Sequence, residues 1–277
     1  FGAGHMVNNY NETGNGNIAV GYMAHYKGTA DAHNIAIGYQ SMTEHTVTGN
    51  YQKNIAIGYQ AMNKSGGNNN IAIGELALKQ ASNTTNNNVS IGYDTMSQSV
   101  TSSGENVVIG KSSGRNIAGS YNIALGSGTL NGACGNLNIA IGSGALESTT
   151  GLSNLALGYQ SGRYVSSGEK NIIIGHATGN NITTAKNCII IGASLNGNNE
   201  DGFIQIGSAL QGTGSQIGLG GAGKGANCAI NTPAGTATIA PLRLNAGTLL
   251  TTPGNGCIEF DGTHLYITIN NARQTII

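Results

Sequence analysis

Few residues of this 277-residue chain have the spacing that catalysis requires. Two acidic pairs lie close in sequence, Glu200 with Asp201 and Glu259 with Asp261. Paired carboxylates facing each other in a cleft cleave glycosidic bonds. The first pair falls in a polar loop segment and the second flanks an Asp-Gly turn signal, so we expect structural roles for both. The sequence therefore predicts no catalytic residue and no enzyme activity.

Metal or cofactor sites are not expected either. The histidines are scattered over loops or irregular positions, without a carboxylate partner at a useful spacing: His5, His25, His33, His45, His176 and His264. The cysteines lack the paired spacing of zinc or redox sites, and we expect them to be reduced or inert: Cys134, Cys188, Cys228 and Cys257.

The composition excludes several classes of protein. Twelve Lys and Arg balance twelve Asp and Glu, and charged residues make up only 9% of the chain, so no basic stripe for nucleic acid exists. No apolar run is long enough to insert into a membrane. Forty-five glycines with three prolines are unlike a globular α/β enzyme.

The dominant pattern is a repeat of the form Asn-Ile-Ala-Ile-Gly. Its glycines recur every 15 to 20 residues, and such a repeat predicts a parallel β-solenoid in which each repeat forms one coil. We expect about twelve coils. The repeat glycines are Gly21, Gly38, Gly58, Gly74, Gly92, Gly110, Gly126, Gly142, Gly158, Gly175, Gly192 and Gly207.

Within each repeat, aliphatic residues stand one and three positions before the glycine, as Ile37 and Ile35 do. This alternation predicts a short strand, and we expect its twenty-four aliphatic side chains to fill a narrow core. Asn opens ten of the repeats, and stacked Asn side chains can bond each other along the axis. The small residue three positions after the glycine is expected to be buried at a corner.

The residue between the two aliphatic positions would then point outward. It is small in most repeats, and small residues allow close approach, so we expect this row to form a contact with other copies of the chain. The predicted contact consists of Ala19, Ala36, Ala56, Ala72, Ser90, Val108, Ala124, Ala140, Ala156, Ile173 and Ile190.

Tyrosines follow several of the repeat glycines and should align along one edge of the rod: Tyr22, Tyr39, Tyr59, Tyr93 and Tyr159. Aromatic rows can stack on sugar rings, which makes this edge a candidate receptor contact. The alternative, which we favour, is that the rings stack on each other from coil to coil.

The repeats weaken after Gly207, and the domain prediction follows from that change. We expect the solenoid over 1–218, a Gly-rich linker over 219–229 and a C-terminal β cap or stem over 230–277, with a hairpin around Asp261-Gly262. Phe1-Gly2 matches the aliphatic–glycine position of a repeat, so the chain is expected to begin inside a coil.

The unit Asn-Ile-Ala-Ile-Gly-x-x-Ala/Ser resembles the head repeat of trimeric autotransporter adhesins over roughly 17–210. That resemblance implies a left-handed β-roll and a homotrimer with the small strand residue at the three-fold contact. The repeats here are longer and more variable than in that family. The Ile-Gly-x-x-Ala-x unit also fits hexapeptide acyltransferases, but those run three units per coil with nearly constant spacing.

The arrays at 34–42 and 54–62, and the segment from Pro241 to Tyr266, are similar to bacteriophage tail fibres and related virion appendage proteins. This resemblance implies a structural virion fibre that contacts itself, other virion proteins and a host-surface glycan or protein. The expected location is a virion appendage. The alternative is an extracellular adhesin head or surface filament on a cell.

Overall fold

The computed structural model describes residues 16–26, 31–43, 51–64, 66–80, 85–99, 104–206, 249 and 257–276. The chain divides into two compact units, Phe1–Gln216 and Ile217–Ile277. The strands of the first unit are β1 (Ile18–Val20), β2 (Ile35–Ile37), β3 (Ile55–Ile57), β4 (Ile71–Ile73), β5 (Val89–Ile91), β6 (Val107–Ile109), β7 (Ile123–Leu125), β8 (Ile139–Ile141), β9 (Leu155–Leu157), β10 (Ile172–Ile174), β11 (Ile189–Ile191) and β12 (Ile204–Ile206).

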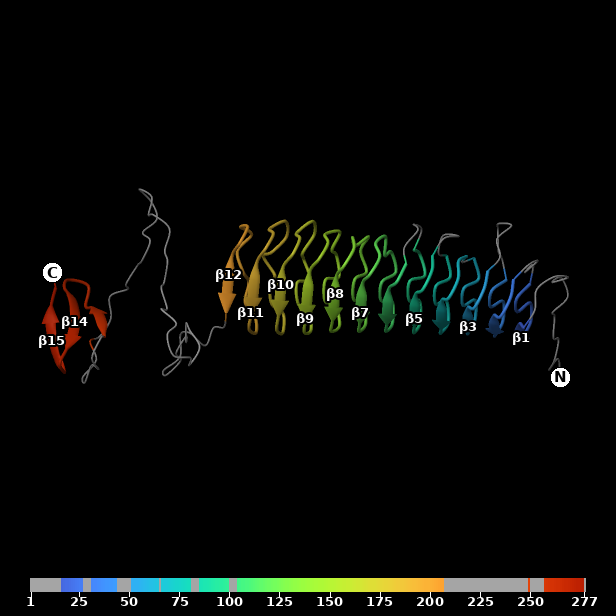
Figure 1. Cartoon of the computed structure of the whole chain (residues 1–277), viewed down its shortest axis with the longest axis horizontal. Coiled ribbons are helices and arrows are strands. Elements are labelled where there is room, and N and C mark those ends of the chain that lie inside the picture. Colours follow the sequence, from blue (N-terminus) through green and yellow to red (C-terminus); the bar gives the residue numbers. More distant parts are fainter. Residues whose placement is uncertain are drawn as a thin grey trace. The chain divides into compact units, whose positions relative to one another are not determined.

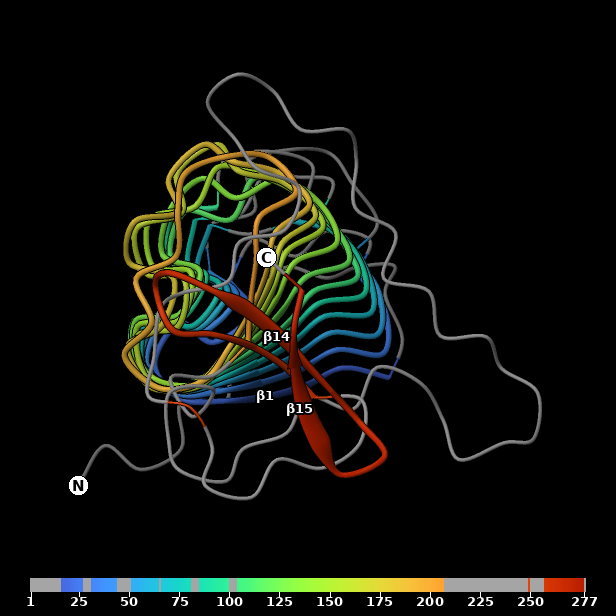
Figure 2. The same cartoon turned by 90° about the vertical axis from the view of Figure 1, so that its left-hand side faces the viewer.

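These twelve strands form one parallel sheet in sequence order, so each strand pairs with the strand of the next repeat (Figure 1). Equivalent residues are in register: Ala36 pairs with Ala56, and Ala56 with Ala72. Viewed along the stack, successive coils lie nearly over one another (Figure 2). The predicted all-β parallel solenoid is confirmed.

The strand faces are the reverse of the prediction. The central residue of the strand points into the coil, and Ala36, Ala56 and Ala72 are 0% exposed. The aliphatic residues on either side point outward, and Ile18 is 52% and Ile37 36% exposed. Alternation along a strand defines two faces, but it does not say which face lies inward.

The predicted trimer contact is therefore wrong, because its side chains lie inside the coils of a single chain. Ala19 is partly buried against this core. The remaining predicted contact residues are fully buried in the chain itself: Ala36, Ala56, Ala72, Ser90, Val108, Ala124, Ala140, Ala156, Ile173 and Ile190.

The coil leaves room only for small central residues because a large side chain enters from the opposite wall. This side chain stands four positions after the repeat glycine, and all its examples are fully buried: Met42, Met62, Leu78, Met96, Leu130 and Leu146. The small residue just before it, such as Ala61 or Ala77, is also buried, as predicted, although it lies in a turn and not in a second strand.

Three coils fill the same space in another way. In these coils the fourth residue after the repeat glycine is Gly114, Gly162 or Gly179. An aliphatic residue three positions later is buried instead: Ile117, Val165 and Ile182. A Cβ built on Gly114 would lie 2.6 Å from Ile117 Cδ1 and 3.1 Å from Val108 Cγ1. Two of these coils also have a larger central residue, Val108 and Ile173, which compensates for missing core volume.

The corner glycine is required by close stacking. Gly92 has φ +131°, and a Cβ built on it would lie 2.6 Å from the carbonyl oxygen of Gly110 in the next coil. Only glycine combines this conformation with such a close backbone contact.

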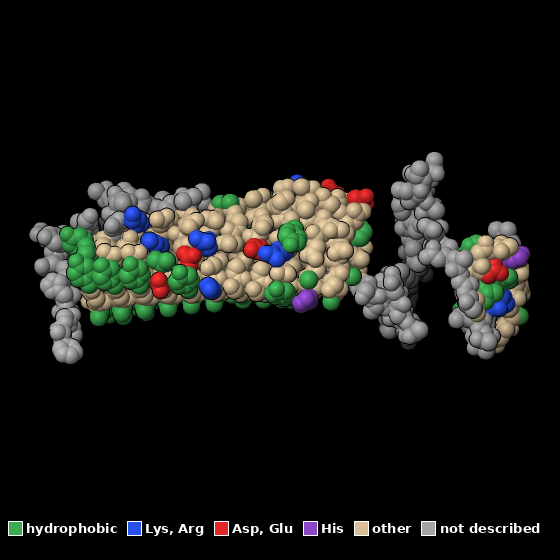
Figure 3. Space-filling model, turned by 180° about the vertical axis from the view of Figure 1, so that it is seen from behind, with side chains coloured by type: hydrophobic (Ala, Val, Ile, Leu, Met, Phe, Trp, Pro, Cys, Tyr) green, Lys and Arg blue, Asp and Glu red, His purple; other side chains and the backbone are tan. Residues whose placement is uncertain are grey.

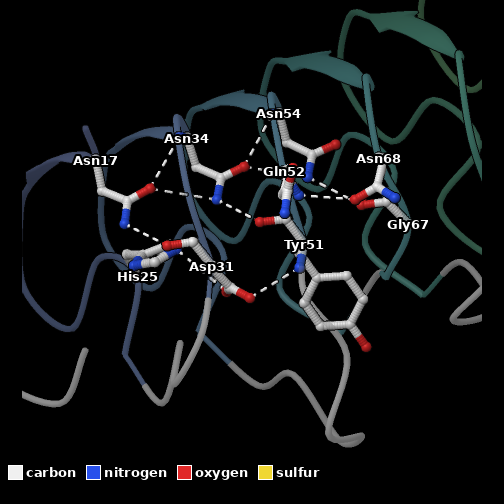
Figure 4. A network of polar contacts seen from close by, with 9 residues as sticks. All are labelled: Asn17, His25, Asp31, Asn34, Tyr51, Gln52, Asn54, Gly67 and Asn68. Atoms are coloured by element: carbon white, nitrogen blue, oxygen red, sulfur yellow. Dashed lines mark hydrogen bonds and ion pairs between the residues drawn. The ribbon is translucent and has the colours of Figure 1, made fainter. Parts of the chain in front are cut away.

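A ladder of buried asparagines runs along the stack, as expected from the sequence (Figure 4). The Oδ1 atom of Asn34 accepts bonds from the backbone nitrogen and the Nδ2 atom of Asn54, at 2.9 and 3.2 Å. The Asn54 side chain receives the same two bonds from Asn70. At the far end, Cys188 replaces asparagine and keeps only the backbone bond to Asn171 Oδ1, at 2.9 Å. The ladder satisfies buried polar groups that would otherwise destabilise the coil.

The second unit contains an antiparallel sheet of β13 (Ile258–Phe260), β14 (Leu265–Ile269) and β15 (Ala272–Thr275). The hairpin predicted at Asp261-Gly262 connects β13 to β14 and is confirmed. Asn270 and Asn271 adopt φ of 51° and 59° in the tight turn before β15. The predicted linker 219–229, most of 230–256 and the predicted start of the chain inside a coil lie outside the described residues.

Candidate interaction surfaces

The most extensive candidate site is the outer face of the twelve-stranded sheet, which we call the aliphatic face. It consists of the first and third residue of every strand from β1 to β12. Repeated hydrophobic side chains line one edge of the solenoid in Figure 3. The most exposed members of the face are Ile18, Val20, Ile37, Ile109, Leu157, Ile172, Ile204 and Ile206.

The size of this face lies at the upper end of the apolar patches found on monomeric proteins. Twelve strands about 4.8 Å apart, each about 10 Å long, cover roughly 550 Å² of flat sheet. Patches on monomeric proteins reach about 300–600 Å² and are often functional at that size. The face contains no charged side chain, because the first and third residues of every strand from β1 to β12 are Ile, Val or Leu. Such a face is suited to contact another apolar surface.

The tyrosine edge lies next to this face, directly after each strand. Tyr22, Tyr39, Tyr59, Tyr93 and Tyr159 are 45–55% exposed. Tyr22 stacks on Tyr39 with ring centroids 5.2 Å apart, and Tyr39 on Tyr59 at 5.4 Å. Tyr159 stacks on His176 at 5.2 Å. The favoured alternative, ring-on-ring stacking, is confirmed for these residues, and stacked rings offer mainly their edges to a ligand.

Tyr93 has different neighbours. Backbone bonds join its coil to those of Glu75 and Lys111, which occupy the equivalent positions on either side. Its ring is 46% exposed and has no aromatic neighbour in its own row. Of the five tyrosines proposed for the receptor edge, Tyr93 is thus the one whose two neighbours in the row are both non-aromatic.

The first coil contains a buried contact between a histidine and a carboxylate that the sequence did not predict. His25 Nε2 lies 3.3 Å from Asp31 Oδ2, and both side chains are 1% exposed (Figure 4). His25 occupies the core position that Met42 and Met62 fill in later coils. Asp31 Oδ1 also accepts a bond of 2.9 Å from the backbone nitrogen of Tyr51. The sequence indicates a core position for His25, because His25 stands four residues after the repeat glycine Gly21. The prediction that no histidine has a carboxylate partner is wrong.

The two acidic pairs have structural contacts. Asp201 Oδ1 accepts a 2.8 Å bond from the backbone nitrogen of Lys186. Glu259 lies 3.0 Å from Arg273. Asp261 accepts bonds from the backbone nitrogens of Thr263 and His264 and from the Tyr266 hydroxyl, and these bonds lower the pKa of its carboxyl to about 2. His264 Nδ1 also lies 3.7 Å from Asp261 Oδ2, a second histidine partner that the sequence did not predict.

Cys134, Cys188 and Cys257 are unpaired thiols, in agreement with the prediction, while Cys228 lies outside the described residues. Burial raises the pKa of Cys134 to about 12 and also raises that of Cys188. Thiols with raised pKa values are poor nucleophiles. Within the described ranges, no group of three or more His, Cys, Asp or Glu residues could hold a metal ion. The part of the chain described here also contains no helix long and apolar enough to cross a membrane.

Comparisons with protein-family models, curated proteins and solved structures find no match to this chain.

Proposed function

We propose that this chain is a self-assembling structural fibre segment, and that its aliphatic face is the contact between copies. The observation that carries the proposal is the unbroken run of aliphatic side chains over β1 to β12. Burying apolar area contributes about 25 cal/mol per Å². A face of this length therefore favours parallel association strongly, whereas a monomer would leave it in water.

The proposed assembly is a homotrimer, which is the order implied by the resemblance to trimeric adhesin heads. This contact differs from the one expected from the sequence. The aliphatic faces of the three chains meet at the centre of the proposed trimer, in place of the small central residues of the strands. The exposed tyrosines lie at the edge of such a contact, where aromatic residues are enriched in protein interfaces.

The proposed role is to build length and to project a host-recognition surface from a virion, as the resemblance to tail fibres implies. A structural role is supported by the uses of the acidic residues, since Asp201, Glu259 and Asp261 all stabilise turns or strands. The segment from Pro241 to Tyr266 favours a virion appendage over a cell-surface adhesin.

The test of assembly is the mass of the protein in solution for three proteins: the unaltered chain, Ile57→Lys on the aliphatic face and Asn116→Lys on an exposed turn. We expect trimers for the unaltered chain and for Asn116→Lys, and folded monomers for Ile57→Lys, since three lysines would meet without partners at the contact. A stable monomer of the unaltered chain would contradict the proposal.

The test of location is detection of the chain in purified virus particles by mass spectrometry. Its recovery from a bacterial envelope, with none in virions, would favour the adhesin alternative.

A further inference from the structure

We propose that a polar hollow over the fourth to sixth coils binds an acidic sugar residue of a glycan. The hollow has a volume of about 280 Å³ and is lined by Leu76, Lys79, Gln80, Asp94, Ser97, Gln98 and Arg115. This inference deepens the proposed host-recognition role and rests on it. It names a site away from the stacked tyrosines.

The hollow arises from side-chain size within one row of the stack. Lys79, Ser97 and Arg115 each stand five positions after a repeat glycine, in three successive coils. Backbone bonds hold these coils together, from Gln80 N to Ser97 O at 3.1 Å and from Gln98 N to Arg115 O at 2.9 Å. A short side chain between two long ones leaves a depression with Ser97 at its floor.

The floor carries a polar atom that lacks a partner. Ser97 is 4% exposed, and its Oγ makes no hydrogen bond within the described part of the chain. A buried hydroxyl without a partner is destabilising. Rotation of the Ser97 side chain would turn this hydroxyl from the closed floor into the hollow, where the hydroxyl of a ligand would supply the missing partner.

The walls fit the chemistry of a sugar. The side-chain amides of Gln80 and Gln98 both donate and accept hydrogen bonds, as vicinal hydroxyls do. The carboxylate of Asp94 accepts, and Leu76 offers an apolar surface to the C–H groups of a pyranose ring. Drug-sized ligands occupy pockets of about 300 Å³ or more, so this hollow holds about one sugar residue.

The charge of the hollow favours an acidic sugar. Arg115 Nε lies 3.0 Å from Asp94 Oδ2, so these two charges compensate each other. Lys79 adds a positive charge, and the lining has a net charge of one positive unit. A carboxylate on the sugar would complete the pairing, whereas a neutral sugar would leave the ammonium unmatched.

The experiment compares methyl glucuronide with methyl glucoside by ligand-observed NMR on the assembled protein. We expect the glucuronide to bind at least about tenfold more tightly than the glucoside. Lys79→Met should bring the two affinities together, and Ser97→Met, which fills the hollow, should abolish both. The charge-matched control Arg163→Met, at the same row position in a later coil, should change neither.

Binding of neither sugar, or binding that survives Ser97→Met, would overturn the site. Equal binding of the two sugars by the unaltered protein would overturn the acidic class. The mass of each variant is measured in parallel, so that a failure of assembly, which bears on the proposed function, is distinguished from a failure of this site.

Discussion

At the scale of single residues, identical amino acids have different constraints according to their place in the coil. The corner glycine of each repeat lies against the backbone of the next coil, as Gly92 does with Gly110. Gly128, two positions after its repeat glycine, has φ +64° and nothing within 4 Å of a Cβ built on it. Other coils place Gln40 and Gln60 at that position with φ near 50°. Of these two positions, only the corner therefore demands glycine.

The prediction at this scale is that Gly92→Ala costs about 2–5 kcal/mol, because strain at positive φ adds to the clash with the next coil. Gly128→Asn is the control, and it should change the free energy of unfolding by less than about 1 kcal/mol. Urea denaturation followed by circular dichroism measures both. Equal losses for the two variants would contradict the close-stacking explanation.

At the scale of elements, each coil has a small core in which a larger side chain at one position accompanies a smaller one at another. Coils with a large residue at the fourth position have a small central strand residue, as Leu146 with Ala140. The coil of Val108 has Gly114 instead and buries Ile117. We expect the coil to accommodate either arrangement, but not a large fourth residue together with Val108 and Ile117.

Gly114→Leu alone should therefore overpack the coil and cost about 1–3 kcal/mol. Adding Val108→Ala and Ile117→Thr recreates the arrangement of Ala140, Leu146 and Thr149, and it should recover most of that loss. Thermal unfolding of the single and triple variants, together with the double variant Val108→Ala/Ile117→Thr, gives the coupling. If the triple variant is no more stable than the added effects of the single and double variants predict, the exchange of volume is refuted.

The C-terminal hairpin gives a prediction about pH. The folded-state pKa of Asp261 is about 2, below the ordinary value of 3.8. Its contribution to the turn is thus fully present above about pH 4 and is lost as the pH falls through about 2. The amide signals of Thr263 and His264 should shift over that range. In Asp261→Asn, which keeps an acceptor oxygen without the charge, this titration should vanish, and its persistence would contradict the assignment.

At the scale of the whole molecule, the two faces of the strands differ in their contacts. The central residues hold each coil together, whereas the flanking aliphatic residues are exposed and form the proposed contact with other copies. The consequences of a mutation should therefore differ between neighbouring residues of one strand.

Ala56→Arg should prevent the third coil from folding, because a charge would enter a core in which Ala56 is 0% exposed. We expect a loss of β-sheet signal by circular dichroism and protease cleavage near this coil. Ile57→Lys, one residue away, should keep the fold and lose only the assembly. If Ala56→Arg folds normally and dissociates instead, the small row is the contact after all.

The amino-acid sequence alone determined the solenoid, because repeat spacing and strand alternation are local patterns. It also determined the asparagine ladder, because one asparagine recurs in each coil and the coils stack. The hairpin at Asp261-Gly262 follows from short-range backbone geometry. Only the tertiary structure decided which strand face lies inward, since that depends on side chains such as Met62 and Leu78 entering from the opposite wall of the coil. The same is true of the pair of His25 with Asp31 and of the hollow at Ser97, because folding and stacking bring together residues that sequence spacing does not relate.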